Sequence, residues 1–230
     1  MAKVKAGVEY TIHIDEKIFR LDRRKYDLLN YINTSGSITE AAKLTKVSYR
    51  TALNYISRIE KTLEINIVHT VKGGKGGGGG TTLTSEGLGI LRECKKINAI
   101  MEIHRELNEI EANVVDINKS QRDMTIQMNE VSITLPLNEK YSIGDKILAL
   151  ISYDNIFIML EVQESSIRNV LKGTIKEMTL KRDMIRVKVD IGGIDVFSDI
   201  TLTASEDLNL HLGKEVYIGF KALSIATLKL

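Results

Sequence analysis

The sequence has little cysteine, little proline and few aromatic side chains: one cysteine, one proline and no tryptophan in 230 residues, with 5% aromatic residues. A lone cysteine, Cys94, makes neither an internal disulfide nor a cysteine-based metal site, which favours a reducing, cytoplasmic setting. The four histidines lack the spacing of metal ligands, so we expect no metal-cation site. No apolar run reaches the roughly 18 residues of a membrane span, and no charged-then-apolar leader is present. We therefore expect neither membrane insertion nor secretion.

The chain carries a formal charge of only +2, but the charge is unevenly distributed. Residues 1–110 hold 18 Lys and Arg against 13 Asp and Glu, and the remainder holds 14 against 17. With 43% hydrophobic residues, the chain is long enough for two cores. The basic half is the better candidate for contact with nucleic acid.

The segment from Ser37 to Leu53 predicts two short helices joined by about three residues, the spacing of a helix-turn-helix. Ser37 and Glu40 form a capping-box pattern, Thr45 to Val47 supply the turn, and Ser48 caps the second helix. The expected inward residues are Ala41, Ala42, Leu44, Ala52, Leu53, Ile56 and Ile59. The outer side offers candidate DNA contacts, namely Ser48, Tyr49, Arg50, Thr51, Asn54 and Arg58. Two amphipathic helices of an ordinary bundle would explain these residues equally well.

Flanking segments predict the rest of this domain. Alternation over Val8–Ile14 and Ile18–Leu21 predicts a small hairpin, and Asp22 caps a helix over Arg23–Asn33. This helix should bury Tyr26, Leu28, Leu29 and Ile32.

A glycine run lies between two strand candidates, Ile65–Val71 and Thr81–Leu83. We interpret it as a wing whose tip carries Lys72 and Lys75, which can follow a phosphate backbone because glycine is conformationally permissive. A disordered linker is the alternative. A nucleotide-binding P-loop is disfavoured, because Lys75 is followed by Gly76 and not by Ser or Thr.

Thr84 caps a further helix, expected from Ser85 to about Glu111. Its one-sided apolar stripe comprises Ile90, Cys94, Ile97, Ile100, Met101, Ile103, Leu107 and Ile110. A long helix of this kind commonly buries its stripe against another chain, so we predict a dimerisation helix and a homodimer.

Together, the GSI-x-x-AAK segment, the SYR segment and the glycine-rich wing followed by LT-x-x-G resemble the winged-helix domain of the molybdate-responsive transcriptional regulators (ModE type). The resemblance covers roughly Leu21 to Leu107. It implies binding to double-stranded DNA.

The second half changes to period-two patterns over Met124–Leu135, Lys146–Ile151, Ile156–Leu160, Asn169–Ile175, Ile185–Val189 and Val216–Phe220. Such short strands predict a small antiparallel barrel or sandwich. Ile133-Thr134-Leu135 followed by Gly144-Asp145 mirrors Ile200-Thr201-Leu202 followed by Gly213-Lys214, which predicts two related barrels.

From Ser165 onward, the Ser166-Ile167-Arg168-Asn169 segment, Thr201 and the Phe220-Lys221-Ala222 end resemble the molybdopterin-binding-protein (Mop) or TOBE domain. That family binds molybdate or tungstate in an OB-like barrel. The resemblance implies an oxyanion site made of Ser166, Arg168, Asn169, Thr201, Lys221 and Ala222, with backbone amides supplied near Asn169 and Ala222. The chemistry agrees, because a tetrahedral dianion offers only acceptors and requires donors and cations.

Two departures from the family pattern affect this site. Ala204 stands where family members often carry another hydroxyl. The first copy has no SxRN segment and has Ser152 in place of Lys221, so we expect it to be degenerate. One oxyanion per chain, two per dimer, is the predicted stoichiometry.

We thus predict an α+β protein with a winged helix-turn-helix domain (1–84), a linker and dimerisation helix (85–113) and an OB-like antiparallel β-barrel Mop/TOBE domain (114–230, second repeat 165–230). The predicted function is oxyanion-sensing transcriptional regulation on a palindromic operator, controlling oxyanion uptake or molybdenum or tungsten cofactor genes. The alternatives are a molybdate or tungstate buffering protein and a DNA-binding regulator without an effector. No catalytic dyad stands out, so we do not predict an enzyme.

Overall fold

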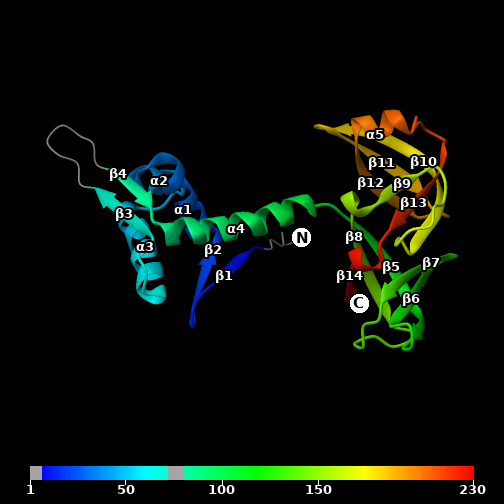
Figure 1. Ribbon diagram of the computed structural model, residues 1–230, viewed down its shortest axis with the longest axis horizontal. Helices are drawn as coiled ribbons and strands as arrows, with labels where there is room; N and C mark the ends of the chain where they lie inside the picture. Colours follow the sequence, from blue (N-terminus) through cyan, green and yellow to red (C-terminus); the bar gives the residue numbers. More distant parts are fainter. Residues whose placement is uncertain (1–6, 72–79) are drawn as a thin grey trace, which may run out of the picture. The chain divides into compact units, whose positions relative to one another are not determined.

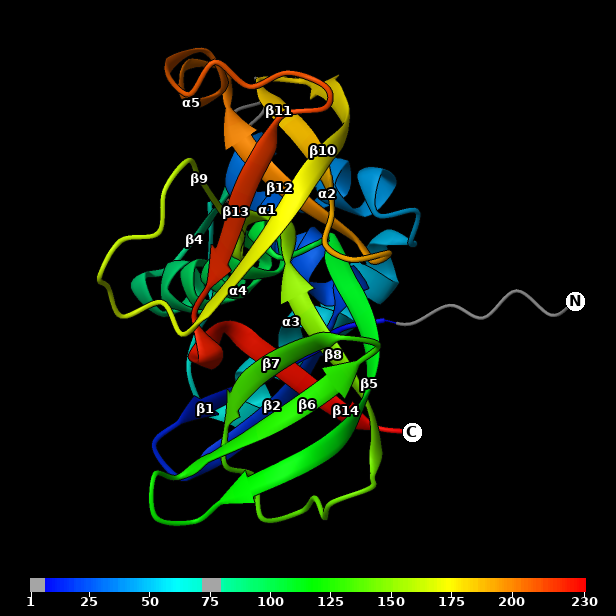
Figure 2. The ribbon, with the colours of Figure 1, turned by 90° about the vertical axis from the view of Figure 1, so that its right-hand side faces the viewer.

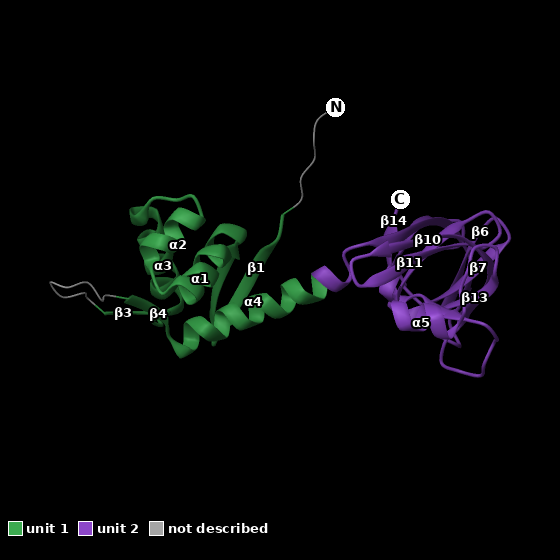
Figure 3. Cartoon of the chain, turned by 90° about the horizontal axis from the view of Figure 1, so that it is seen from above, with its two compact units in different colours: residues 1–101 green, residues 102–230 purple. Residues whose placement is uncertain are grey.

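The computed structural model describes residues 7–71 and 80–230, so the wing lysines Lys72 and Lys75 lie outside the described residues. The chain forms two compact units, Met1–Met101 and Glu102–Leu230 (Figures 1 and 3). Within the described ranges, no helix is long and apolar enough to cross a membrane.

Unit 1 combines helices with two small hairpins. Its elements are β1 (Glu9–Ile14), β2 (Lys17–Asp22), α1 (Arg23–Ser35), α2 (Ile38–Leu44), α3 (Tyr49–Leu63), β3 (Val68–Val71), β4 (Gly80–Leu83) and α4 (Ser85–Ile103). β1 pairs antiparallel with β2 and β3 with β4, which confirms both predicted hairpins.

Side-chain caps begin all four of these helices at the predicted residues, and for α4 the Thr84 hydroxyl accepts from the Gly87 N–H at 3.1 Å. The Asp22 carboxylate accepts from the Lys25 N–H at 3.0 Å, and the Ser48 hydroxyl accepts from the Thr51 N–H at 3.0 Å. The Ser37 hydroxyl accepts from the Glu40 N–H at 3.3 Å, but the Ser37 N–H donates to the hydroxyl of Ser35. The reciprocal half of the predicted capping box is therefore replaced by a serine contact.

The core of unit 1 contains the expected inner faces of α1, α2 and α3, with two exceptions. Tyr26, Leu28, Leu29, Ile32, Ala41, Ala42, Ala52, Ile56 and Ile59 are buried. Leu44 is 48% exposed and Leu53 is 39% exposed, so their predicted burial is wrong. On α3 the buried residues Ala52 and Ile56 define one stripe, and Leu53 lies about 100° around the helix from Ala52.

Helix α4 ends earlier than predicted. It stops at Ile103, and Leu107–Asn118 forms strand β5, so the expectation of helix to about Glu111 is wrong. Burial alternates along β5, with Asn108, Ile110, Ala112 and Val114 inside. Over such a short segment, apolar residues separated by two, three and four positions fit both the helical period of 3.6 and the strand period of two. Pairing with the neighbouring strands makes this segment a strand.

Cys94 is completely buried, and burial raises the pKa of its thiol from 9.0 to about 11. The thiol should therefore resist alkylation by iodoacetamide at pH 8, because both access and the thiolate are missing. Since the folded pKa is the higher one, this thiol's contribution to stability is complete below about pH 9 and should be lost as pH rises through 11. Labelling as fast as that of the urea-unfolded chain would contradict this placement.

Unit 2 is built from two five-stranded antiparallel sheets. The order is β14-β8-β5-β6-β7 in one sheet and β12-β11-β10-β13-β9 in the other. Bounds for the first repeat are β6 (Asp123–Met128), β7 (Val131–Pro136), β8 (Lys146–Ser152), the short helix η1 (Tyr153–Asn155) and β9 (Phe157–Met159). Bounds for the second are β10 (Asn169–Lys181), β11 (Met184–Asp190), β12 (Asp195–Thr201), α5 (Leu202–Asp207), β13 (Glu215–Phe220), the short helix η2 (Ala222–Ser224) and β14 (Ile225–Lys229).

The two repeats exchange their last strands. β9 leaves the first repeat and pairs with β13, while β14 leaves the second and pairs with β8 (Figure 2). Both sheets contribute side chains to one continuous apolar core, which includes Ile126, Ile151, Val187 and Ile218. The repeats therefore cannot be separated without exposing that core.

The structure confirms the repeat but changes part of its alignment. Val114 N–H donates to Asp145 O as Ile175 N–H donates to Lys214 O, and both long strands have a bulge at this point. The matching of Thr134 with Thr201 is wrong, because the equivalent of Thr134 is Phe197, as the asparagine contacts described below show. The second copy is longer because α5 is inserted after β12.

Candidate functional site

Among the residues that the structure describes, no other element covers one face of α3 in unit 1. Tyr49 is half exposed, and Arg50, Asn54 and Arg58 are exposed on the side of α3 opposite its buried stripe. The face thus presents two guanidinium groups, an amide and a phenol, all of which donate hydrogen bonds. The prediction of an outward polar face is confirmed.

Ser48 and Thr51 have a largely structural position at the start of α3. Their hydroxyls contact each other at 2.8 Å, and the Ser48 oxygen also caps the helix. The preceding turn places Lys46 at φ 58 and bonds the Val47 N–H to Ala42 O at 3.0 Å. This turn holds α3 against α2 and sets which residues of α3 point outward.

In unit 2 the structure brings Arg168 and Lys221 together. Asn169 is the cross-strand partner of Phe220, so the residue before β10 lies opposite the residue after β13. Both cations are exposed, as is Ser166 two residues upstream, and Ala222 is half-buried at the start of η2. Within the described part of the chain, neither cation forms an ion pair with an acidic residue. Two adjacent positive charges repel each other, and an anion bound between them would stabilise both.

The side chain of Asn169 has a structural role. It is buried, accepts from the Thr134 N–H at 2.7 Å and donates to Thr134 O at 3.0 Å. Asn108 makes the same pair of bonds with Phe197, at 2.7 Å and 2.9 Å. Each repeat thus uses one asparagine to join the other, and the Asn169 amide is unavailable as a ligand donor.

Thr201 lies at the other end of the sheet from Arg168. It pairs with Met184, which pairs with Lys181 at the far end of β10. Twelve residues separate Asn169 from Lys181, roughly 40 Å of strand before bending is considered. The Thr201 hydroxyl also caps α5 by accepting from the Ala204 N–H at 3.1 Å. Within one chain the structure does not group Thr201 with Ser166, Arg168 and Lys221.

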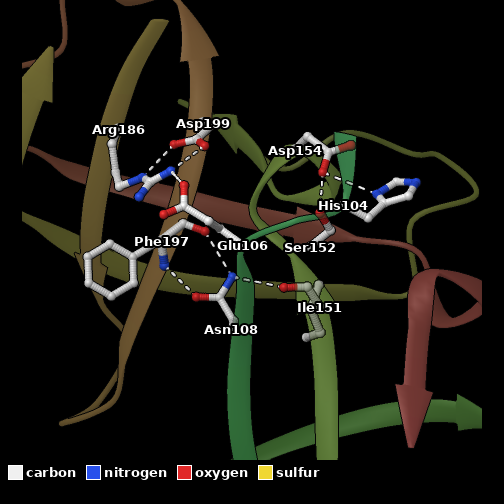
Figure 4. Close-up of polar contacts among 9 residues, drawn as sticks. All are labelled: His104, Glu106, Asn108, Ile151, Ser152, Asp154, Arg186, Phe197 and Asp199. Atoms are coloured by element: carbon white, nitrogen blue, oxygen red, sulfur yellow. Dashed lines mark hydrogen bonds and ion pairs between the residues drawn. The ribbon is translucent and has the colours of Figure 1, made fainter. Parts of the chain in front are cut away.

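The first repeat lacks both cations at the equivalent end. Leu107 is the cross-strand partner of Ser152, at the positions that Arg168 and Lys221 occupy in the second repeat. Ser152 is buried and donates to Asp154 (Figure 4). These two positions therefore supply no positive charge with which to hold a dianion.

A polar cluster that sequence reasoning missed occupies the region beside the first repeat's end. Arg186 donates to both carboxylate oxygens of Asp199, at 2.8 and 2.7 Å, and also to Glu106 (Figure 4). The hydrogen bonds that Arg186 donates to Asp199 and then to Glu106 raise its pKa, and the guanidinium lowers the pKa of Glu106. Alternating charges on strands are common, so no signal in the sequence distinguishes these three residues.

A cavity of about 500 Å³ adjoins this cluster, lined in part by Arg105, Tyr153, Lys181 and Met184. Among residues 7–71 and 80–230, no group of three or more His, Cys, Asp or Glu side chains is suited to hold a metal ion.

Comparison with known proteins gives matches to both halves. The TOBE domain model matches residues 165–226, which is the second repeat. The DNA-binding transcriptional dual regulator ModE of Escherichia coli K12 is 29% identical over 223 residues, covering 95% of this chain and 70% of that protein. The molybdenum import ATP-binding protein ModC of Haemophilus ducreyi is 31% identical over 101 residues, covering 44% of this chain and only 29% of its own length. A crystal structure of the cytoplasmic molybdate-binding protein ModG with molybdate bound has a TM-score of 0.47 and 19% identity, covering 52% of this chain and 94% of that one.

Proposed function

From a chain that has homologues among the ModE-type regulators along 95% of its length and carries a TOBE domain, we infer an oxyanion-responsive transcriptional regulator. We propose that unit 1 is a winged-helix domain that binds double-stranded DNA in the cytoplasm, as a homodimer. Unit 2 is proposed to bind molybdate or tungstate and thereby to control the binding of unit 1 to DNA. The proposed targets are genes of oxyanion uptake or cofactor synthesis.

The DNA-binding part of the proposal depends on the exposed face of α3. Arg50 and Asn54 are of the residue types that pair with guanine and adenine edges in the major groove. The basic wing lysines Lys72 and Lys75 are proposed to contact phosphates beside it, since phosphate contacts position a protein and base contacts specify the sequence.

Arg50→Ala is expected to relax sequence preference at one base position of each half-site, by about 1–3 kcal/mol of discrimination. The double change Lys72→Ala with Lys75→Ala should weaken binding to all sequences alike and reduce the salt dependence by about two phosphate contacts. Binding-site selection from random DNA, repeated at several salt concentrations, measures both effects. Equal loss of specificity from the two variants would contradict this division of roles.

The oxyanion part of the proposal depends on one observation, the exposed pair Arg168 and Lys221 without an acidic partner in the described structure. Two cations can compensate a dianion, which lowers the cost of removing it from water. The Ser166 hydroxyl and the backbone near Ala222 are proposed as further donors.

Because Thr201 lies at the opposite end of β10, we propose that Thr201 of a second copy completes each site. In a dimer with twofold symmetry, each protomer contributes its Thr201 to the site of the other protomer, which gives two sites per dimer. The exposed stripe of α4, comprising Ile97, Ile100, Met101 and Ile103, is proposed as part of the contact between copies. Occupancy of such a site would favour one arrangement of the dimer over another.

Titration of the full chain by calorimetry with molybdate, tungstate and sulfate tests the ligand. Molybdate or tungstate at a hundredfold excess over its dissociation constant should stabilise the fold by about 2.7 kcal/mol, and sulfate should do far less. Four oxyanions per dimer would show that the first repeat binds as well. Binding of oxyanion without any effect on DNA affinity would favour a buffering protein instead.

A further inference from the structure

Three residues, His104, Arg105 and Glu106, connect the end of α4 to the first barrel strand β5. Such a short connector could swing freely, because a few unpaired backbone dihedrals suffice for a hinge. In this chain, side chains at both ends of the connector form hydrogen bonds or ion pairs with the two repeats. His104 and Glu106 point to different elements of unit 2 (Figure 4).

Glu106 is bonded to the second repeat. Its carboxylate accepts from Arg186 on β11, whose guanidinium is also held by both oxygens of Asp199 on β12. The Arg186 side chain is only 14% exposed, and its guanidinium lies 4.6 Å from the centre of the Tyr153 ring, which stacks on Phe197. A guanidinium so enclosed has little freedom, so the carboxylate that it binds is held at a defined place.

His104 is bonded to the first repeat. Its Nδ1 lies 3.3 Å from Asp154 Oδ1 in η1, and the same carboxylate accepts from Ser152. The backbone adds a third contact, because the Tyr153 N–H donates to Glu106 O at 3.2 Å. The connector therefore contacts both repeats within three residues.

The corresponding place at the start of the second repeat has none of these groups. Asp123 pairs with Pro136 as Arg186 pairs with Asp199, and Ile167 stands in the position of Glu106. The strand order is the same in both repeats, so the fold alone does not require the ionic cluster. The cluster is present only at the place where the chain passes from α4 into the first repeat.

We propose that Glu106, Arg186 and Asp199, with His104 and Asp154, form a clasp that fixes the exit of α4 to both repeats, and that these are positioning residues for coupling between ligand and DNA binding. This inference rests on the proposed function, since coupling requires both activities. A ligand changes DNA affinity only through a segment whose arrangement differs between states, and a loose connector would dissipate that difference. By holding the connector to both repeats, the clasp makes a rearrangement of the barrels a movement of the helix end.

Glu106→Gln tests the clasp with little risk to folding, because this side chain is 55% exposed and Arg186 keeps its bidentate contact with Asp199. Glu102→Gln is the matched control. Glu102 lies one turn earlier and pairs at 3.6 Å only with Arg105, within the same connector segment and not with a barrel strand. Both variants remove one carboxylate charge.

The first readout is hydrogen–deuterium exchange of the full chain without ligand. Amides from His104 to Asn108 should exchange severalfold faster in Glu106→Gln and at the wild-type rate in Glu102→Gln. Equal rates in the two variants would overturn the clasp. This result stands apart from the proposed function, because it requires neither DNA nor oxyanion.

The second readout is the factor by which saturating sodium molybdate changes affinity for a DNA fragment selected by the wild-type chain. Coupling of this kind commonly amounts to 5–150-fold, and Glu106→Gln should reduce the factor at least threefold while leaving the molybdate dissociation constant unchanged. Glu102→Gln should retain the wild-type factor. Full coupling in Glu106→Gln would overturn the positioning role, whereas a wild-type chain that fails to respond to molybdate would contradict the proposed function and leave the exchange experiment to decide the clasp.

Discussion

Arg168→Ala is expected to abolish molybdate binding at micromolar concentrations, with a loss of affinity of at least about 100-fold. Removing one cation leaves Lys221 as the only charge opposite the dianion, and breaking a charge pair that the second copy of the proposed dimer buries costs about 3–5 kcal/mol. Since each 1.4 kcal/mol is tenfold in affinity, calorimetry should detect no binding in the range where the wild-type chain saturates. Lys221→Ala should lose nearly as much.

Lys119→Ala is the matched control for this prediction. It removes one exposed cation from the turn between β5 and β6 in the first repeat, at no proposed ligand contact. Its affinity should stay within about twofold of wild type, because surface charges act weakly at a distance in physiological salt. Arg168→Ala that retained half of the sites would show that the first repeat binds oxyanion and that its divergence has been misinterpreted.

Asn169→Ala is expected to destabilise unit 2 by about 2–4 kcal/mol. The substitution removes two hydrogen bonds and leaves the N–H and C=O of Thr134 without their partner in a partly buried place, at a cost of about 1–3 kcal/mol for each unsatisfied group. Asn108→Ala should behave alike, because Asn108 makes the same pair of bonds with Phe197. Scanning calorimetry of the full chain, which follows the transition of each unit, measures the effect.

Asn113→Ala provides the comparison, since Asn113 lies on the same strand β5 as Asn108 but is exposed. Surface substitutions of this kind usually change stability by less than about 0.5 kcal/mol. If Asn169→Ala were as mild as Asn113→Ala, the asparagine would not join the two repeats, and its amide would be free to serve as a ligand donor after all.

The sequence alone determined the elements whose signals are local. Asp22, Ser37 and Ser48 begin helices because a side-chain oxygen accepts from a backbone N–H three residues later, which depends on no distant contact. The hairpin β1–β2 and the outward face of α3 likewise follow from alternation and from a stripe of period 3.6. The family resemblance was also readable there, because it depends on residue types in a fixed order.

Tertiary structure decided what depends on pairing between distant segments. Leu107–Asn118 became a strand because β6 and β8 pair with it, although its residues also fit the end of a helix. Asn169 turned inward to Thr134, Thr201 came to the opposite end of the sheet from Arg168, and Glu106 met Arg186 across eighty positions of chain. Strand register and the exchange of β9 and β14 determine which of these residues meet. Neither leaves a local mark, because a one-residue change of pairing alters every cross-strand neighbour without altering the sequence of any strand.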